Sequence, residues 1–363
     1  MRQNLRIPGP TPLPAQVQAA MHRDMIDHRG PEFANILNQC TESLKYFYCT
    51  KGDVLIFPAS GTGGLEAAIV NTLSPRDPVL AVSIGVFGDR FAKIAETFGL
   101  DVRRVSIPKG RAVDPEQLRQ ALDENPDVKA VLITHNETST GVTNPLKDLA
   151  TIVKERNLLL LVDAVSSMGA IPVLTDEWGL DVVVSGSQKA WMIPPGMVMV
   201  SVSERAWQAV QAAKLPRYYW DFRAAKSSLE KGQTPYTPAV SLFYALEVAL
   251  DLMMREGREA IWERHAEAGA YTRNRIKEMG LELFADERYA SNTVTAIKVP
   301  EGIDGKAFKN NLRDKHGVIV GGGQAELSGR IIRLGHLGYF TKEDISAACD
   351  AIQMELESLK VAP

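Results

Sequence analysis

Short apolar runs alternate with amphipathic segments over the first 250 residues of the chain. Val128–Thr134, Leu158–Val162 and Asp181–Val184 show almost no polar alternation, and similar runs fall at Asp53–Phe57 and Pro78–Val82. Strands of a parallel sheet give such runs, because helices bury both faces of the sheet. The pattern predicts an α/β fold with a mostly parallel, doubly wound sheet.

Helix signals fall between these runs. Asp114 is a predicted N-cap, and Pro115 stands at the first helical position that follows it. The further predicted elements are a strand at Val102–Val105 and helices over Leu65–Thr72, Asp89–Phe98 and Pro115–Glu124.

The pattern changes after Ala225. Lys226–Pro238 is polar and rich in turn residues, so it is predicted to be an irregular excursion. Helices are predicted over Ala239–Arg255, Ile261–Met279, Lys306–Lys315 and Glu343–Leu359, and strands at Thr293–Val299 and Ile331–Leu334. We therefore predict an N-terminal arm (1–15), a large domain (16–254) and a smaller α+β domain (255–363).

Composition narrows the class of protein. The 363 residues are 45% hydrophobic, which excludes a disordered chain, and 41 basic against 44 acidic residues argue against a nucleic-acid or polybasic membrane partner. No apolar run approaches the ~20 residues that span a bilayer, and the N-terminus shows no secretory signal. Three cysteines without a CxxC pair suit a reducing compartment, so we expect a cytoplasmic protein. The six histidines show no metal-ligand spacing, and no metal is predicted.

Four predicted strand ends carry chemically useful residues. They are followed by Ser60–Gly63, by the hydroxyl-rich segment His135–Gly141, by Asp163 and by Ser185–Lys189. Ligands of parallel sheets bind beyond the carboxyl ends of the strands. These four segments are therefore predicted to form one site.

Each segment has a functional and a structural interpretation. Ser60–Gly63 opens a helix and can cradle a phosphate, or it can be a plain N-cap turn, but it is neither a Walker loop nor a dinucleotide fingerprint. Asp163 follows an apolar strand, where it needs a cationic or N–H partner or serves as a turn residue. Lys189 lies in apolar surroundings that favour a nucleophilic amine able to form a Schiff base, although many such lysines extend to solvent. Together the three suit pyridoxal 5′-phosphate (PLP), because they offer partners for its phosphate, ring nitrogen and aldehyde carbon.

Beyond these residues, motifs along nearly the whole chain resemble those of class V, fold-type I, PLP-dependent aminotransferases. The similarity is greatest to the alanine–glyoxylate and serine–glyoxylate aminotransferase group. The motifs are PGPTPLP (8–14), HRGPEF (28–33), ASGTGG (59–64), HNETSTGV (135–142), VDAVSSMG (162–169), SGSQKAWMIPPG (185–196), PYTPAVSLFYAL (235–246) and RLGHLG (333–338).

The resemblance implies a role for individual residues. Lys189 would bind the cofactor covalently and carry the proton, and Asp163 would pair with the ring nitrogen. Val165 and Phe87 would cover the two ring faces, with Phe87 standing where many relatives have tryptophan. The remaining implied contacts are Ser60, Gly61, Thr62 and Gln188 to the phosphate, Thr138 to the phenolic oxygen, and Arg333 to the substrate carboxylate.

The resemblance also implies a homodimer with sites at the interface. Tyr236 and Thr237 would reach the phosphate of the partner subunit, although Thr234 is an alternative to Tyr236. Gly9-Pro10-Thr11 either lies near the substrate pocket or forms a rigid arm. Gly321-Gly322-Gly323 is predicted to be a mobile turn near Arg333.

The activity implied is transfer of an amino group from a small L-amino acid, alanine or serine, to glyoxylate by a ping-pong mechanism. Ureidoglycine–glyoxylate and aminoethylphosphonate–pyruvate transamination remain alternatives. Aspartate as donor is another, since Arg29 or Arg223 could supply a second cation. The alternative that is not an enzyme is a subunit that binds PLP without catalysing a reaction. Cysteine desulfuration is disfavoured because Cys349 lies in a helical pattern, and a dehydrogenase because its glycine fingerprint is missing. We expect His22 and His28 to be solvated or capping, and His135 to be structural rather than a base.

Overall fold

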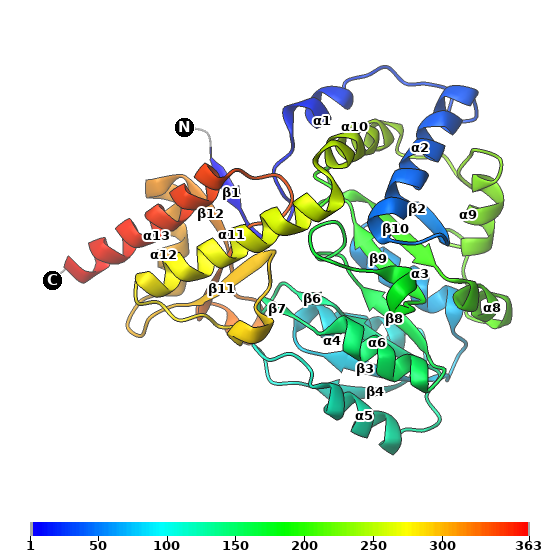
Figure 1. Ribbon diagram of the computed structural model, residues 1–363, viewed down its shortest axis with the longest axis horizontal. Helices are drawn as coiled ribbons and strands as arrows, with labels where there is room; N and C mark the ends of the chain where they lie inside the picture. The colour runs from blue at the N-terminus through cyan, green and yellow to red at the C-terminus, as the bar shows by residue number, and fades with distance from the viewer. Residues whose placement is uncertain (1–2, 362–363) are drawn as a thin grey trace.

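The larger sheet of the protein has seven strands (Figure 1). The computed structural model describes residues 3–361. All neighbouring strands of this sheet are parallel except β10, which is antiparallel to both of its neighbours. In spatial order the strands are β2 (Asp53–Ala59), β10 (Gly196–Val202), β9 (Val182–Gly186), β8 (Leu159–Asp163), β5 (Ala130–Thr134), β3 (Pro78–Ser83) and β4 (Asp101–Ser106).

Helices cover both faces of this sheet, as its apolar strands require. The first face carries α1 (Ala15–Ala20), α2 (Pro31–Tyr48), α5 (Pro115–Glu124), α6 (Leu146–Glu155) and α10 (Val240–Glu256). The second face carries α3 (Gly61–Thr72), α4 (Val86–Thr97), α8 (Glu204–Ala212) and α9 (Phe222–Leu229). The short elements α7 (Thr175–Trp178), β6 (Asn136–Glu137) and β7 (Val142–Thr143) lie in the connections.

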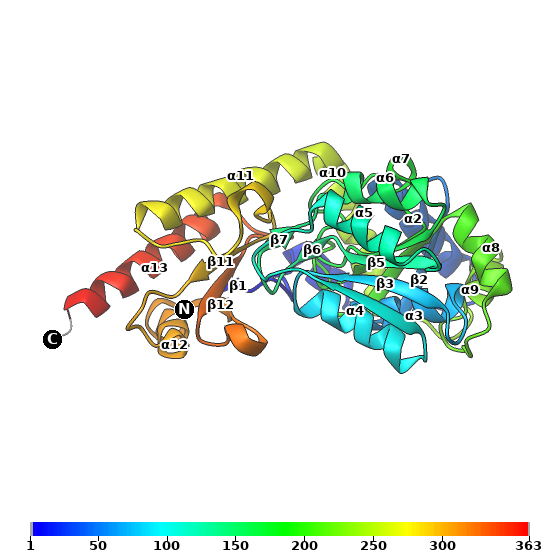
Figure 2. The ribbon, with the colours of Figure 1, turned by 90° about the horizontal axis from the view of Figure 1, so that it is seen from below.

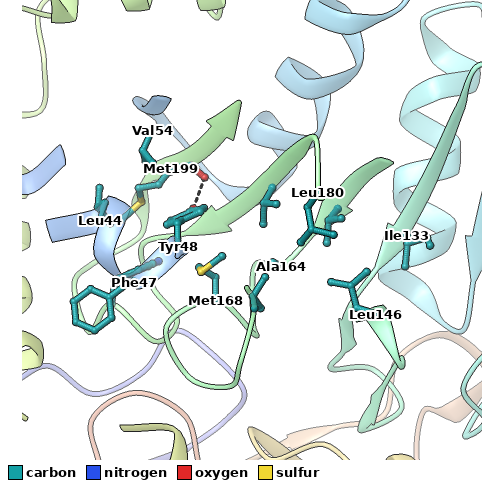
Figure 3. Packing of buried hydrophobic residues seen from close by; sticks show 14 of the residues in the cluster. Leu44, Phe47, Tyr48, Val54, Ile133, Leu146, Ala164, Met168, Leu180 and Met199 are labelled. Carbon is teal, nitrogen blue, oxygen red and sulfur yellow. Dashed lines mark hydrogen bonds between the residues drawn. The ribbon is translucent and has the colours of Figure 1, made fainter. Parts of the chain in front are cut away.

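Successive residues of each strand face opposite cores. In β3, Leu80 and Val82 belong to the first core, whereas Val79 and Ala81 belong to the second. In the first core, the buried Tyr48 hydroxyl donates to the Met199 carbonyl at 2.8 Å (Figure 3). This bond satisfies the one polar atom of the tyrosine ring inside an apolar cluster.

A second, four-stranded sheet lies beside the first, with three helices packed on it (Figures 1 and 2). Its strands are β1 (Asn4–Arg6), β12 (Val318–Gly322), β13 (Ile331–Gly335) and β11 (Val294–Lys298). Its helices are α11 (Arg258–Glu278), α12 (Gly305–His316) and α13 (Lys342–Val361), and the 3-10 turns are Glu287–Tyr289 and Ala325–Leu327.

The N-terminal strand β1 pairs with a strand from the C-terminal part of the chain. Asn4 pairs with Val318, so β1 forms the edge of the sheet that the last third of the chain builds. The predicted arm therefore begins as part of the small sheet. The boundaries predicted at residues 15 and 255 stay predictions, and residues 1–2 and 362–363 lie outside the described part of the chain.

The α/β class and the predicted helices and strands are confirmed, with two local corrections. Gly321 and Gly322 are not a mobile turn but the end of β12, where they pair with Arg333 and Ile332. The predicted excursion begins too early, because α9 continues to Leu229. Among residues 3–361, no helix is long and apolar enough to cross a membrane.

Candidate active site

Lys189 lies in the turn after β9 and is 9% exposed. Its Nζ donates to the Pro8 carbonyl. Burial, together with the positive charge of Arg333, lowers the pKa of the Lys189 amine to about 8, and Asp163 opposes this shift. A buried amine with a lowered pKa is a good nucleophile near neutral pH.

This pKa gives a direct prediction for the cofactor-free protein. Acylation of Lys189 by an amine-selective reagent should rise with pH and reach half its maximum near pH 8, because only the deprotonated amine reacts. Peptide mass spectrometry across a pH series measures this, with the exposed Lys93 in the same sample as the accessibility reference. An acylation rate of Lys189 that still climbs steeply between pH 9 and 10 would contradict the prediction.

Asp163 is the last residue of β8 and is 4% exposed. Its Oδ1 accepts from the Val165 amide at 3.0 Å, and its Oδ2 lies 3.4 Å from the Thr134 hydroxyl. Burial raises the pKa of this carboxyl to about 6, and the nearby charge of Glu137 adds to the shift. A carboxylate so poorly stabilised is well suited to pair with a protonated ring nitrogen.

The turn from β2 into α3 has free donors for a phosphate. Ser60 is the N-cap, but its hydroxyl makes no capping hydrogen bond. The amides of Gly63 and Gly64 bond to the Ser60 carbonyl, whereas the first two amides of the helix, from Gly61 and Thr62, have no partner within residues 3–361. Amides at the start of a helix, with its dipole, bind anions.

The side-chain amide of Gln188 lies near the same turn, and its buried oxygen, Oε1, lacks a hydrogen-bond partner in the described part of the chain. This oxygen lies 3.3 Å from the position a Cβ would take on Gly186, and the Gly61 amide is 3.7 Å from that position. An amide side chain can present its NH2 group instead, by rotating half a turn. A phosphate beside Gly61 would therefore satisfy Gln188.

Two apolar side chains lie at or near the starts of α3 and α4. Val165 lies against the turn so closely that a Cβ on Gly61 would come within 2.6 Å of its Cγ2. Phe87 is the second residue of α4. The Arg90 guanidinium lies 4.8 Å from the Phe87 ring centre and donates to the Thr62 hydroxyl at 3.3 Å, which links the starts of α4 and α3.

Arg333 lies on β13 and is 7% exposed. Its Nε donates to the Gly322 carbonyl at 2.8 Å and its Nη1 to the Thr138 carbonyl at 2.9 Å. No salt bridge to Arg333 is present among the described residues, and burial lowers the pKa of the guanidinium. The buried guanidinium of Arg333 is therefore held by two neutral carbonyls and has no anionic partner among the described residues. A substrate carboxylate could supply that partner.

The segment Pro8–Thr11 covers Lys189. The Thr11 amide donates to the Gln188 carbonyl at 3.1 Å, and its hydroxyl donates to the Lys189 carbonyl at 3.0 Å. A Cβ on Gly9 would lie 2.7 Å from Lys189 Nζ, so a larger residue there would displace the lysine amine. Of the two interpretations of this segment, the structure favours the one that places it at the pocket.

Within the described part of this chain, Tyr236 and Thr237 form no hydrogen bond with Lys189, Asp163 or Arg333. The Tyr236 hydroxyl donates to the Tyr218 carbonyl at 3.2 Å, and the Thr234 hydroxyl donates to the Tyr236 carbonyl at 2.7 Å. Arg29 is held by this same loop, through the Gln233 side chain at 2.8 Å and the Thr234 carbonyl at 3.0 Å.

Comparisons with known proteins identify the family of the chain. The family model described as "Aminotransferase class-V" matches residues 13–347. The chain belongs to the class V aminotransferase family.

Its relatives within and around this family carry different names. It is 43% identical to the soluble hydrogenase small subunit of Synechococcus sp., over 98% of this chain and 93% of the relative. It is 38% identical to L-aspartate–glyoxylate aminotransferase of Paracoccus denitrificans (92% and 86% covered) and 36% identical to serine–glyoxylate aminotransferase of Methylorubrum extorquens (100% and 93% covered). The crystal structure of alanine–glyoxylate aminotransferase from Nostoc sp. matches with a TM-score of 0.94 at 33% identity, over 98% of this chain and 96% of that chain. The fold is therefore that of a fold-type I aminotransferase.

Sequence reasoning missed one buried acid at this aminotransferase site. Glu137 is fully buried and accepts from the amides of Phe87 and Gly88. The sequence places it in a polar loop next to Thr138, and nothing local distinguishes it from a solvated glutamate. The buried His135 was predicted to be structural, and burial lowers the pKa of its ring to about 3, which keeps it neutral. Within residues 3–361, no group of three or more His, Cys, Asp or Glu side chains could hold a metal ion.

Proposed function

We propose that this class V aminotransferase binds PLP through Lys189 and transfers the amino group of a small L-amino acid, alanine or serine, to glyoxylate in a ping-pong cycle. The observation that carries the proposal is the buried, nucleophilic amine of Lys189, whose charge interacts with both Asp163 and Arg333. These two residues offer partners for the two charged parts of the reaction, the ring nitrogen of the cofactor and the carboxylate of the substrate.

The residues at the site fit the cofactor. The unsatisfied Gln188 side chain and the free amides at the start of α3 support Ser60, Gly61, Thr62 and Gln188 as the phosphate-binding residues. Val165 and Phe87 are proposed to cover the two faces of the ring. Thr138 is proposed to donate to the phenolic oxygen through its hydroxyl, which is the one donor of its side chain. Its carbonyl accepts from Arg333.

The protein side chains then divide the chemistry. When bound, PLP supplies an electron sink that stabilises negative charge at the substrate α-carbon. Arg333 orients the substrate by binding its carboxylate with the N–H groups that its two carbonyl partners leave free. The Lys189 amine would hold the cofactor and, when free, would serve as the base that removes the α-proton, a role that its lowered pKa allows near neutral pH.

The surroundings of Lys189 favour a small donor with one carboxylate. Pro8 and Gly9 lie directly on the amine and limit the space above it. Arg29 is bonded to the Gln233–Thr234 segment, and Arg223 forms a salt bridge with Asp221 at 3.1 Å. Arg223 is therefore already paired with an anion, whereas Arg29 has only neutral acceptors among the described residues and is the cation that aspartate as donor would need.

Two alternatives are favoured by the names of relatives. Aspartate as donor is raised by the Paracoccus relative, and a non-catalytic PLP-binding subunit by the Synechococcus relative. Ureidoglycine–glyoxylate and aminoethylphosphonate–pyruvate transamination stay open on the same scaffold. Location in the cytoplasm stays a prediction from the cysteine content.

The enzyme is further proposed to be a homodimer in which Tyr236 and Thr237 complete the partner's phosphate site. An aromatic group supports this, because Tyr219 stacks on Tyr236 with ring centres 5.3 Å apart while Tyr218 beside it is 78% exposed. Large apolar rings left in solvent are typical of protein interfaces.

The test is the choice of donor. Glycine formed from glyoxylate is measured with L-alanine, L-serine and L-aspartate at equal concentrations, using the PLP-loaded protein. We expect L-alanine or L-serine to exceed L-aspartate in initial rate by about 10-fold or more. Faster transfer from L-aspartate would overturn the donor assignment, and no glycine from any donor would overturn glyoxylate transamination.

A further inference from the structure

Four donors converge on the buried carboxylate of Glu137. Its Oε2 accepts from the amides of Phe87 at 3.0 Å and Gly88 at 3.1 Å. Its Oε1 accepts from the Ser139 amide at 3.1 Å and the Ser139 hydroxyl at 2.6 Å. Every partner is a donor, so the group is specified as a carboxylate, which only accepts.

Glu137 caps a helix from another part of the chain. The N-cap of α4 is Gly85, which has no side chain to cap the helix. The Val86 amide donates to the Ser139 hydroxyl at 3.1 Å, so the first three amides of α4 all end on Glu137 and Ser139. A Cβ on Gly85 would lie 2.6 Å from Glu137 Cδ, which explains why glycine stands there. The anion also lies at the positive end of the helix dipole.

The same short segment holds Arg333. The Thr138 carbonyl, which accepts from Arg333 Nη1 at 2.9 Å, lies between Glu137 and Ser139. Both flanking residues are fixed by the bonds at the start of α4, so the direction of this carbonyl is fixed with them. Burial lowers the pKa of Arg333, and the charge of Glu137 offsets part of this effect because it favours the protonated guanidinium.

We propose that Glu137 is a positioning residue that sets Phe87 and Arg333 together, and so couples the orientation of the cofactor ring to binding of the substrate carboxylate. The proposal rests on the proposed function, since it assigns those roles to Phe87 and Arg333. In this proposal Glu137 acts through the Phe87 amide and the Thr138 carbonyl rather than by direct contact with cofactor or substrate.

Glu137→Gln is the variant that tests this. Glutamine has the same shape, but its NH2 group must face either the two α4 amides or the Ser139 amide, so at least one donor loses its acceptor. Asp89→Asn is the matched control, because it removes a carboxylate from the same first turn of α4 without touching the Thr138 segment. Asp89 is half exposed and accepts from the Ser83 hydroxyl.

Two readouts on PLP-loaded protein separate positioning from stability. The first is the visible circular dichroism per bound cofactor, which reports ring orientation. The second is the L-alanine concentration that half-bleaches the visible band without an acceptor. We expect Glu137→Gln to weaken the dichroism and to raise the half-bleaching concentration by about 10-fold, because charged hydrogen bonds are lost. Asp89→Asn should leave both within about twofold, as a surface charge does.

Each result decides the matter. A Glu137→Gln protein that only melts at a lower temperature, with both readouts as in the wild type, would overturn the positioning role. Should that variant not fold, Ser139→Ala takes its place. It keeps the carboxylate but removes the bonds to Val86 and Glu137, and is expected to raise the half-bleaching concentration about threefold; no change would overturn the proposal. Wild-type protein that binds no PLP, or does not bleach, would instead count against the proposed function.

Discussion

Replacing Lys189 with alanine is expected to slow amino-group transfer by about 10⁴-fold while the protein still folds. The amine is both the proposed attachment point of the cofactor and the proposed base, so both contributions are lost together. The fold should survive because the Lys189 side chain bonds only to the Pro8 carbonyl. It also lies beyond the carboxyl end of β9 and not among the side chains of the sheet core.

The measurement for Lys189→Ala is the rate at which L-alanine bleaches PLP-loaded protein, together with the mass of the protein after borohydride reduction. Wild-type protein should retain the cofactor covalently after reduction, and Lys189→Ala should not. Lys189→Arg is the matched control, because it keeps the positive charge but offers no nucleophilic amine. It should be as inactive as the alanine variant. Transfer at the wild-type rate in either variant would remove Lys189 from the mechanism and favour a non-catalytic role.

Replacing Asp163 with asparagine is expected to slow transfer by about 10²- to 10³-fold. The neutral amide has nearly the same shape, and its oxygen can still accept from the Val165 amide, so the loop after β8 should keep its conformation. What it removes is the negative charge proposed to hold a proton on the ring nitrogen. Without that charge, the ring withdraws electrons from the substrate less strongly.

The control for Asp163→Asn is Asp181→Asn at the start of β9. Asp181 is also buried, but it forms a salt bridge with Arg205 and accepts from the Leu160 amide, away from the site. Asp181→Asn should lower the melting temperature and leave the transfer rate within about threefold. Equal transfer rates for Asp163→Asn and wild-type protein would show that the charge of Asp163 is not needed.

The layout of the site could be predicted because it follows the strand ends. The apolar runs that become β5, β8 and β9 are each followed by polar residues, and parallel strands bring those residues to one edge. The sequence order alone thus placed Asp163 and Lys189 together, and the resemblance to class V aminotransferases added Arg333.

Glu137 and the cover over Lys189 depend on contacts between distant segments. Glu137 meets Phe87 and Gly88 about fifty residues before it. The strand that anchors Pro8–Thr11 is only three residues long and pairs with β12 near the other end of the chain. Local periodicity carries no information on such pairing.

The end of β12 was misinterpreted because glycines are depleted in strands. The structure shows why Gly321 stands there. A Cβ at this position would lie 3.1 Å from Pro8 Cδ and 3.5 Å from Arg333 Cβ, so the strand passes close both to the segment that covers Lys189 and to Arg333. Asp221 caps the start of α9, and the helix runs into the polar, turn-rich residues that predict an irregular segment from Lys226.

The most direct test of the central claim is the visible absorption spectrum of the PLP-loaded protein before and after L-alanine or L-serine is added without an acceptor. The account predicts a yellow band that bleaches with at least one of these donors and returns when glyoxylate is added. A yellow band indifferent to both donors would keep the fold and the cofactor but reject the proposed substrates. No band, even with PLP in excess, would contradict the assignment of Lys189 and Asp163.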